Sequence, residues 1–481
     1  MKKLSVNFLY NLSYKMLLIL APLVTTPYLA RTLGAGAIGE YSYVSTLVNM
    51  FLLVGGLGSG LYAQRGVAQR RDNLEEKSLF CKEVFLIRLI GISVSLGFFL
   101  ITAIFSQNSI LYLICSIEIV AYIFDISWLY QGEEDFGKVL LRNFILKLVT
   151  IILIYILIKS PKDIYKYALL RASSLVISNL SIWPFVKQHV LLKLPNNINL
   201  KKHIAPILKL FIPQISTQLY SNSDKIILKW VKNDNVENGY YDQTYKVIEM
   251  GLIFVQALSA TVLPRLSYLY ASGKKQEYKE LLFQYFRVVI MFSFPMAMGL
   301  YLIAGEFAEY FFGDGYEKVG LLLKIYSPYL AIAIFSGAIC QQYLVVTGKE
   351  KRYMKMTMFG AIFNIIVNLY LIPVHASIGA VISTILSECM LMVMAMRAVS
   401  KDGIMRPSEF LILSKCYVIA SIIMAIVLMY LNDTLPHNVF FLVFKILLAI
   451  LIYVISLAIM KEPFVREIWN KISQRGKNSV G

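Results

Sequence analysis

The sequence predicts an all-α polytopic membrane protein with about fourteen transmembrane helices, because of its composition and the length of its apolar segments. Of its 481 residues, 58% are hydrophobic and 16% are charged, and the mean hydropathy is +0.64. Soluble domains are typically ~45–50% apolar and ~25% charged. Apolar segments such as 93–105 and 420–431 are continuous, whereas the strands of an outer-membrane barrel alternate over ~10 residues. An ordinary soluble enzyme and an outer-membrane barrel are therefore both excluded.

The expected helices are apolar windows of about the length that spans a bilayer, ~20 residues each. They cover residues 10–30, 39–63, 83–105, 109–131, 140–159, 164–186, 204–231, 239–264, 281–304, 320–345, 354–373, 376–396, 409–431 and 438–460. The seventh and eighth windows are the weakest, because both carry charged residues. The longest polar connections are residues 64–82, 187–203 and 265–280, and none is long enough to fold as a catalytic domain.

The distribution of basic residues predicts the orientation. Lysine and arginine gather in alternate connections and in both termini. Cytoplasmic loops of membrane proteins carry an excess of these residues, so both termini are expected in the cytoplasm. The net charge of +18 is explained by the basic residues of these cytoplasmic loops. For this reason no nucleic-acid partner is predicted.

A weak internal repeat predicts the domain organisation. Pro22 precedes Gly39-Glu40-Tyr41 in the first half, as Pro213 precedes Gly239-Tyr240-Tyr241 in the second. Helix breaks at matching places in two halves are typical of a transporter site, although prolines are common in membrane helices anyway. The predicted parts are an N-terminal six-helix lobe (1–190), a C-terminal six-helix lobe (191–400), and two extra transmembrane helices with a cytoplasmic tail (401–481).

Charged residues inside the expected spans predict a polar cavity. A charge near the bilayer centre costs several kcal/mol unless it faces a partner or water. Basic side chains suit an anionic cargo such as a phosphate, and acidic side chains suit a coupling cation. The predicted substrate-binding residues are Arg31, Lys147, Arg171, Lys225 and Lys246. The predicted ion-coupling residues are Glu118, Asp125, Asp224, Glu249 and Glu388.

The alternative is that these charges only neutralise one another. Lys246 and Glu249 are three residues apart and could pair on their own helix. Glu118 and Glu388 have no basic residue within four positions and are the more plausible carriers. Lys445 lies on the last helix, where its side chain is expected to extend to the membrane surface.

The sequence contains no motif that is typical of a soluble enzyme. There is no Walker A loop, and the four histidines and five cysteines lack metal-ligand spacing. The histidines are interpreted as loop residues. No catalytic residue, metal or cofactor is predicted, and a proton or sodium gradient is the expected energy source.

Several segments resemble the Wzx-type polysaccharide repeat-unit flippases. These segments are PLVTTPYLARTLG at 22–34, DISWLYQGEEDF at 125–136, and FIPQIS at 211–216. The resemblance covers about residues 11–397 and includes Lys147, Asp224, Lys225 and Lys246. One departure is Tyr62-Ala63-Gln64-Arg65, where the family often has glycine in place of Ala63.

The resemblance implies membership of the multidrug/oligosaccharidyl-lipid/polysaccharide exporter superfamily, with two six-helix lobes around a central cavity. It implies a flippase that moves undecaprenyl-pyrophosphate-linked oligosaccharide repeat units across the bacterial cytoplasmic membrane by cation-coupled alternating access. The product would be a capsule, an O antigen or an exopolysaccharide. The implied partners are this cargo, membrane lipid, and the polymerase and glycosyltransferases of the same pathway.

Other functions remain open. A MATE-like cation-coupled exporter of small molecules usually carries cations, so acids without bases would be expected in its cavity. A membrane polysaccharide polymerase or glycosyltransferase would need a large extracytoplasmic loop. A scaffold without transport would have no use for so many charges within the membrane.

Overall fold

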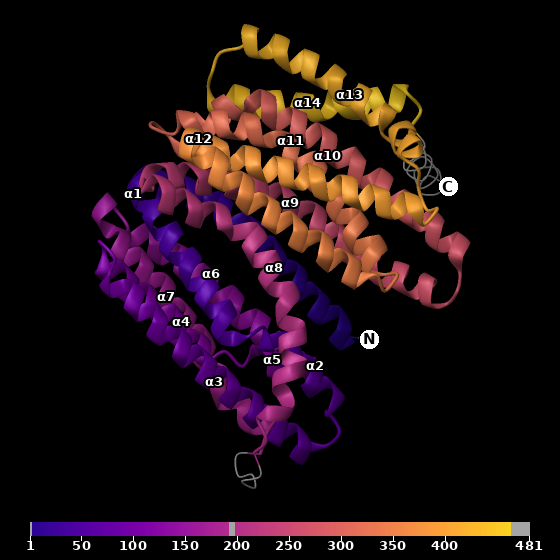
Figure 1. The fold of residues 1–481 in the computed structure, drawn as a ribbon. Helices are drawn as coiled ribbons and strands as arrows, with labels where there is room; N and C mark the ends of the chain where they lie inside the picture. Colours follow the sequence, from indigo (N-terminus) through magenta and orange to yellow (C-terminus); the bar gives the residue numbers. More distant parts are fainter. Residues whose placement is uncertain (1, 192–197, 463–481) are drawn as a thin grey trace. The chain divides into compact units, whose positions relative to one another are not determined.

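The computed structural model describes residues 2–191 and 198–462, which form a series of α-helices with short connections (Figure 1). Internal contacts divide the chain into two compact units, Met1–Gly239 and Tyr240–Gly481. The sequence predicted three parts on the basis of an internal repeat. The internal contacts do not test this three-part division.

The first unit is formed by eight helices and two short 3₁₀ turns among its described residues. They are α1 (Lys2–Gly56), α2 (Ser59–Gln69), α3 (Leu74–Ile104), α4 (Ser109–Ile123), α5 (Ser127–Gly132), α6 (Phe136–Leu157), η1 (Pro161–Asp163), α7 (Ile164–Leu180), η2 (Trp183–Gln188) and α8 (Lys201–Lys232). Helix α9 (Asn235–Ala271) begins at the boundary. The second unit continues with α10 (Lys275–Phe312), α11 (Glu317–Ile339), the π-helical turn η3 (Cys340–Val345), α12 (Glu350–Lys401), α13 (Pro407–Thr434) and α14 (Val439–Ile459).

The predicted windows fall on helical segments, although 39–63 and 109–131 each extend across a break between two helices. In addition, two pairs of windows fall on single kinked helices. The first two windows share α1, whose backbone breaks at Gly34 with a φ of 77°. The eleventh and twelfth share α12, which breaks at Ala376 with a φ of 50°. Glycine adopts a positive φ readily, whereas alanine is strained there. Sequence analysis predicted a connection between two helices near each of these breaks. In the structure, the chain instead changes direction at a single residue.

Ten helices of the described chain are long and apolar enough to cross a membrane. This set counts α1 and α12 once each, joins α4 with α5, and leaves out α2, α6 and α8. An all-helical chain with this many apolar helices is a multi-pass membrane protein.

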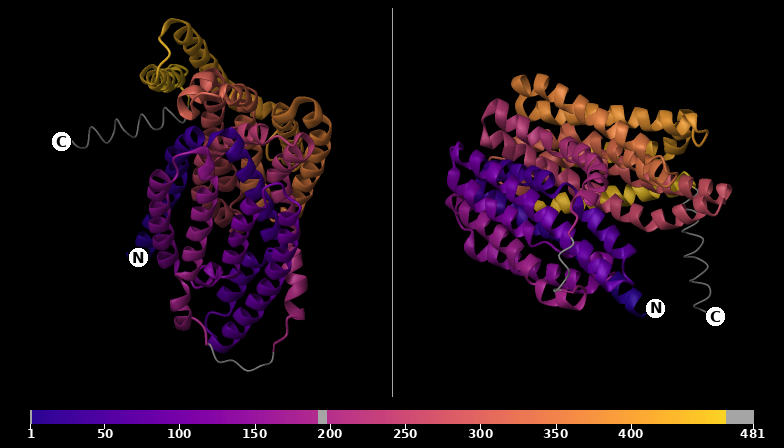
Figure 2. Two further views of the ribbon diagram at one scale, coloured as in Figure 1. Left: turned by 90° about the vertical axis from the view of Figure 1, so that its left-hand side faces the viewer. Right: turned by 60° about the horizontal axis from the view of Figure 1, so that its bottom comes forward.

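In the first unit, α1 packs against α3, α4 and α6, and α4 packs against α7. Figure 2 shows these helices from two further sides. Helices α1 and α3 meet closely at Gly55 and Gly91, where a Cβ on Gly91 would lie 2.3 Å from the Gly55 carbonyl oxygen. One turn further, Ser95 Oγ donates a hydrogen bond to the Phe51 carbonyl oxygen at 2.5 Å. Small residues thus allow two long helices to approach backbone to backbone.

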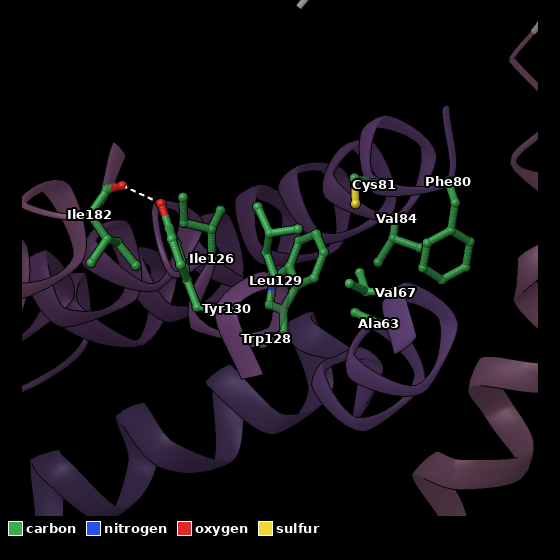
Figure 3. Packing of buried hydrophobic residues seen from close by; sticks show 10 residues of the cluster. All are labelled: Ala63, Val67, Phe80, Cys81, Val84, Ile126, Trp128, Leu129, Tyr130 and Ile182. Carbon is green, nitrogen blue, oxygen red and sulfur yellow. Dashed lines mark hydrogen bonds between the residues drawn. The ribbon is translucent and has the colours of Figure 1, made fainter. Parts of the chain in front are cut away.

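A buried apolar cluster joins α2, α3 and α5 at one end of the first unit (Figure 3). Trp128 and Leu129 of α5 belong to it, together with Cys81 and Val84 of α3. Tyr130 is fully buried, and its hydroxyl donates to the Ile182 carbonyl oxygen at 2.6 Å. Four residues of the resembling segment 125–136, Ile126, Trp128, Leu129 and Tyr130, therefore belong to this core.

In the second unit, α10 packs against α11, α13 and α14. Lys445 of α14 is fully buried, and its Nζ lies 2.7 Å from Oε1 of Glu306 on α10. His437 Nδ1 contacts the same oxygen at 2.7 Å. The expectation that Lys445 extends to the membrane surface is therefore wrong. A carboxylate on a neighbouring helix neutralises its charge within the protein, which removes the need to reach water.

Candidate functional site

A polar cluster of the first unit contains three of the predicted site residues. We define the Glu118 cluster as Tyr41 (α1), Glu118 (α4), Lys147 (α6), Tyr167 and Arg171 (α7). Tyr41 donates to Glu118 Oε1 at 3.4 Å, and both side chains are buried. Arg171 forms a side-chain hydrogen bond with Tyr41 and attracts Glu118 electrostatically. The tyrosine rings of 41 and 167 pack edge to face at 5.0 Å.

The basic side of the Glu118 cluster lies on α6 and α7. Lys147 and Arg171 are both half-buried, and their positive charges repel each other. One turn along each helix, the hydroxyls of Thr150 and Ser174 hydrogen-bond at 2.9 Å and hold α6 and α7 together. The buried Nε of Arg171 has no hydrogen-bond partner among the described residues. With two bases and one acid, the cluster has an excess positive charge and a free donor, which suits an anion.

A second charged pair lies near the end of α4. Arg88 of α3 is buried, and its guanidinium lies 3.7 Å from Oδ2 of Asp125 and 4.8 Å from the Tyr122 ring centroid. Asp125 Oδ1 accepts hydrogen bonds from the amide and the hydroxyl of Ser127, at 3.0 and 2.6 Å. This predicted ion-coupling residue thus shapes the turn into α5 while it pairs with Arg88.

Sequence analysis missed a third network, which joins α2, α3 and α8. Glu83 is fully buried and accepts hydrogen bonds from His203 Nε2 at 2.8 Å, Lys202 Nζ at 2.9 Å and the Asn199 amide at 2.8 Å. His203 Nδ1 lies 2.7 Å from the Tyr62 hydroxyl. If His203 is neutral, Nε2 carries the proton toward Glu83, and Nδ1 accepts from Tyr62. The interpretation of His203 as a loop residue is wrong, because it lies buried in α8.

In the second unit, Glu388 of α12 is also buried. Ser336 of α11 donates a hydrogen bond to its Oε1. Cys340, the first residue of η3, and Tyr353 lie close enough to interact electrostatically with the carboxyl group. A π-helical turn beside a buried acid is notable, since such turns frequently occur at functional sites.

The remaining predicted residues occupy separate helices. Lys246 of α9 pairs with Asp242 at 2.7 Å, a partner that sequence analysis did not consider. Glu249 is exposed on the same helix. Arg31 is exposed on α1, and α8 carries the buried Asp224 beside the half-buried Lys225. The structure thus brings together Glu118, Lys147 and Arg171 in the first unit, whereas Lys246, Glu249 and Glu388 belong to the second.

Outside the apolar segments, an ionic cluster connects the two ends of α12. Asp402 Oδ2 accepts from Lys349 Nζ at 2.8 Å, from Tyr343 at 2.7 Å and from Arg352 at 3.4 Å. Partial burial opposes ionisation of Asp402, but these hydrogen bonds outweigh it and hold the pKa of the carboxyl below its usual range. Burial likewise opposes the charge on Lys349, but its hydrogen bonds to Asp402 and Tyr343 raise the pKa of the ammonium group.

Acid is expected to break this ionic cluster. A carboxyl whose pKa is lowered by folding stabilises the protein above its unfolded pKa of ~3.9, and this contribution is lost as pH falls through the folded pKa. The Lys349 contribution is present below ~10.4 and is lost only as pH rises through its higher folded pKa. At pH 7, Asp402→Asn should therefore lower the unfolding free energy by about 1 kcal/mol, and the difference should begin to shrink near the unfolded pKa of ~3.9 and vanish only once the pH is below the folded pKa of Asp402. Thermal unfolding of the purified protein at several pH values measures this, and equal stability at pH 7 would contradict the prediction.

Within the described residues, no group of three or more His, Cys, Asp or Glu side chains is arranged to hold a metal ion. The charged clusters described above are buried or half-buried among the helices of each unit. Such an arrangement is typical of a transporter, because intramembrane charges mark substrate and ion pathways.

The family model described as "Polysaccharide biosynthesis protein" matches residues 4–270, and the model described as "MatE" matches residues 210–370. The first match covers more than half of the chain, so the chain belongs to this polysaccharide biosynthesis family, the Wzx-type flippases of the exporter superfamily. A similar protein of Shigella dysenteriae is described as "Putative O-antigen transporter". It is 24% identical over 389 residues, which are 79% of this chain and 96% of the relative.

Two solved structures share the fold. The structure titled "Lipid II flippase MurJ, inward closed conformation" superposes with a TM-score of 0.74 at 18% identity, over 96% of this chain and 99% of the other. An inward-facing multidrug resistance MATE transporter superposes with a TM-score of 0.60 at 14% identity, over 82% of this chain and 98% of the other. The relatives with assigned roles are transporters and flippases, and this chain belongs with them rather than with enzymes.

Proposed function

We propose that this protein is a flippase that moves undecaprenyl-pyrophosphate-linked oligosaccharide repeat units from the inner to the outer leaflet of the bacterial cytoplasmic membrane. The observation that carries the proposal is the family match over residues 4–270. The relative described as an O-antigen transporter supports the same cargo class, and the flippase fold supports the same kind of movement. Capsule, O antigen and exopolysaccharide are the products that such a step serves.

The charge of the Glu118 cluster supports an anionic cargo. Charge-assisted hydrogen bonds from Arg171 and Lys147 are the kind that bind a diphosphate. The unpartnered Nε of Arg171 offers one more donor. We propose that both residues contact the diphosphate or an acidic sugar, and that Arg31, Lys225 and Lys246 contribute further contacts along the path.

We further propose fourteen spans, with both termini in the cytoplasm. The ten apolar helices become twelve segments when α1 and α12 are divided at Gly34 and Ala376, and α6 and α8 supply two more. The basic loops support the orientation. Glycosyltransferases that build the repeat unit and a polymerase that consumes it are the partners that this chemistry requires.

Loss of the protein is expected to stop surface polysaccharide synthesis after the repeat unit is assembled. Deletion of the gene should deplete surface polysaccharide, while lipid-linked repeat units accumulate in the cytoplasmic leaflet. Mass spectrometry of extracted lipids, together with enzymatic access to the sugar from each side of the membrane, measures both effects. Accumulation in the outer leaflet instead would contradict the proposed step, because it would place the defect after translocation.

Gradient coupling is expected to depend on Glu118 or Glu388. The chain carries no nucleotide motif, and the membrane potential supplies about 2.3 kcal/mol per charge per 100 mV. In proteoliposomes with an imposed proton or sodium gradient, Glu118→Gln and Glu388→Gln should lose the gradient-driven part of flipping. Glu277→Gln, an exposed acid on α10, is the control. If both intramembrane variants keep full gradient-driven transport, neither residue is the carrier.

A second candidate is a MATE-like exporter of small cations, which the match over residues 210–370 favours. The excess positive charge of the Glu118 cluster argues against it, since a cationic cargo would be repelled. Export of a fluorescent cationic dye from cells that overproduce the protein would support this second candidate.

A further inference from the structure

An apolar cavity of about 230 Å³ lies beside the buried cluster of the first unit. Its wall includes Cys81 and Phe85 of α3, Trp128 of α5, Trp183 of η2, and Val190. Figure 3 shows Cys81, Trp128 and Leu129, which the buried cluster shares with the cavity wall. The cavity lies within one unit and contains none of the residues assigned to the cargo.

The indole nitrogens of the two wall tryptophans are already satisfied by the protein. The indole N–H of Trp128 donates to the Asp125 carbonyl oxygen at 3.1 Å, and that of Trp183 donates to the Phe124 carbonyl oxygen at 2.9 Å. The two rings are held in place and can present only hydrocarbon to the cavity. A largely apolar surface of this kind favours contact with hydrocarbon groups over water.

One charged side chain, Lys82, lines the same cavity. It is half-buried and forms no hydrogen bond or ion pair with any residue in 2–191 or 198–462. The nearby acids are engaged elsewhere, because Glu83 binds Lys202 and His203, and Glu133 binds Lys77 at 2.6 Å. Lys82 is therefore available to an anion from outside the chain.

We propose that this cavity binds one acyl chain of an anionic phospholipid, with the phosphate against the Lys82 ammonium group. Tryptophan and lysine gather at the membrane–water interface, where lipid headgroups lie. The volume accommodates the end of one straight chain, and each buried methylene should increase the affinity about fourfold. The lipid is a bilayer phospholipid, because bilayer phospholipid surrounds the protein and its unbranched chain needs less width than a branched polyprenyl chain.

The bound lipid would link α3, α5 and η2 at the headgroup level. A ligand that binds only the folded state stabilises it by mass action. Added anionic phospholipid should therefore raise the unfolding temperature of the detergent-solubilised protein, and Lys82→Gln should reduce that rise.

Photolabelling of the full-length protein tests the proposal. The probe is phosphatidylglycerol with a diazirine at the end of one acyl chain, added to the protein in detergent and mapped by mass spectrometry of peptides. Label should appear on peptides that contain Phe85 or Trp183, and Lys82→Gln should lower it about tenfold. Lys201→Gln is the matched control, an exposed lysine at the start of α8, beside the Lys202 that binds Glu83, and it should label like the wild type.

A competition experiment distinguishes the two lipids that carry a phosphate on a hydrocarbon chain, a bilayer phospholipid and a polyprenyl phosphate. Excess unlabelled phosphatidylglycerol should remove the label, and an equal excess of polyprenyl phosphate should not. Label outside the cavity, equal labelling of Lys82→Gln, or removal by polyprenyl phosphate alone would each overturn the assignment. None of these results bears on oligosaccharide flipping, which is measured separately.

Discussion

Arg171→Ala is expected to reduce flipping about ten- to a hundred-fold while the protein still inserts into the membrane. A charge-assisted contact is worth ~1.5–3 kcal/mol, which corresponds to this loss of affinity. Arg171 has a buried donor without a protein partner among the described residues, so a bound anion is its expected acceptor. Flipping of a fluorescent lipid-linked oligosaccharide in proteoliposomes measures the effect, at matched protein amounts.

A double variant separates cargo binding from charge neutralisation at the Glu118 cluster. Arg171→Ala alone also removes the positive charge that attracts the buried Glu118 carboxylate, which leaves that charge less compensated and destabilises the protein. Arg171→Ala with Glu118→Gln removes that penalty, so it should restore protein stability. Flipping without an imposed gradient, which Glu118→Gln alone is expected to keep, should stay low in the double variant. Lys166→Ala is the control on the same helix, since Lys166 is exposed and pairs with Asp163. Recovered transport in the double variant would show that Arg171 serves only to balance Glu118.

Gly91→Ala is expected to destabilise the first unit strongly. The added methyl group would lie 2.3 Å from the Gly55 carbonyl oxygen, a distance that α1 and α3 can relieve only by moving apart. Overpacking of this kind typically costs ~1–3 kcal/mol and sometimes more, and it would also strain the Ser95 hydrogen bond to α1. The amount of protein in the membrane and the thermal unfolding midpoint in detergent measure the loss.

Gly97→Ala on the same helix is the matched control. A Cβ at Gly97 would have no atom within 4 Å outside its own helix, so the alanine fits without movement. Alanine favours a helix by ~1 kcal/mol over glycine, so this variant should match or exceed the wild type. Equal loss in both variants would show that glycine is needed for a reason other than the α1–α3 contact.

Much of the fold follows from the sequence, because a bilayer leaves few choices. A long apolar run must form a helix in order to satisfy its own backbone hydrogen bonds. For this reason each predicted window lies on one helix or on two consecutive helices of the structure. The kinks were harder to predict, because Gly34 resembles any loop glycine, and nothing in the identity of Ala376 indicates a positive φ.

The sequence by itself determined the class of the protein, its helices and which residues carry charge inside the apolar segments. Only the tertiary structure decided how those charges are paired. Arg171 attracts Glu118 electrostatically, His203 hydrogen-bonds to Glu83, and Lys445 pairs with Glu306, across 53, 120 and 139 positions of the chain. Local spacing favours partners three or four residues away, as in the suggested pair of Lys246 and Glu249. Within a membrane the cost of an isolated charge is so high that any base on a neighbouring helix can become the partner, and helix packing alone selects which one.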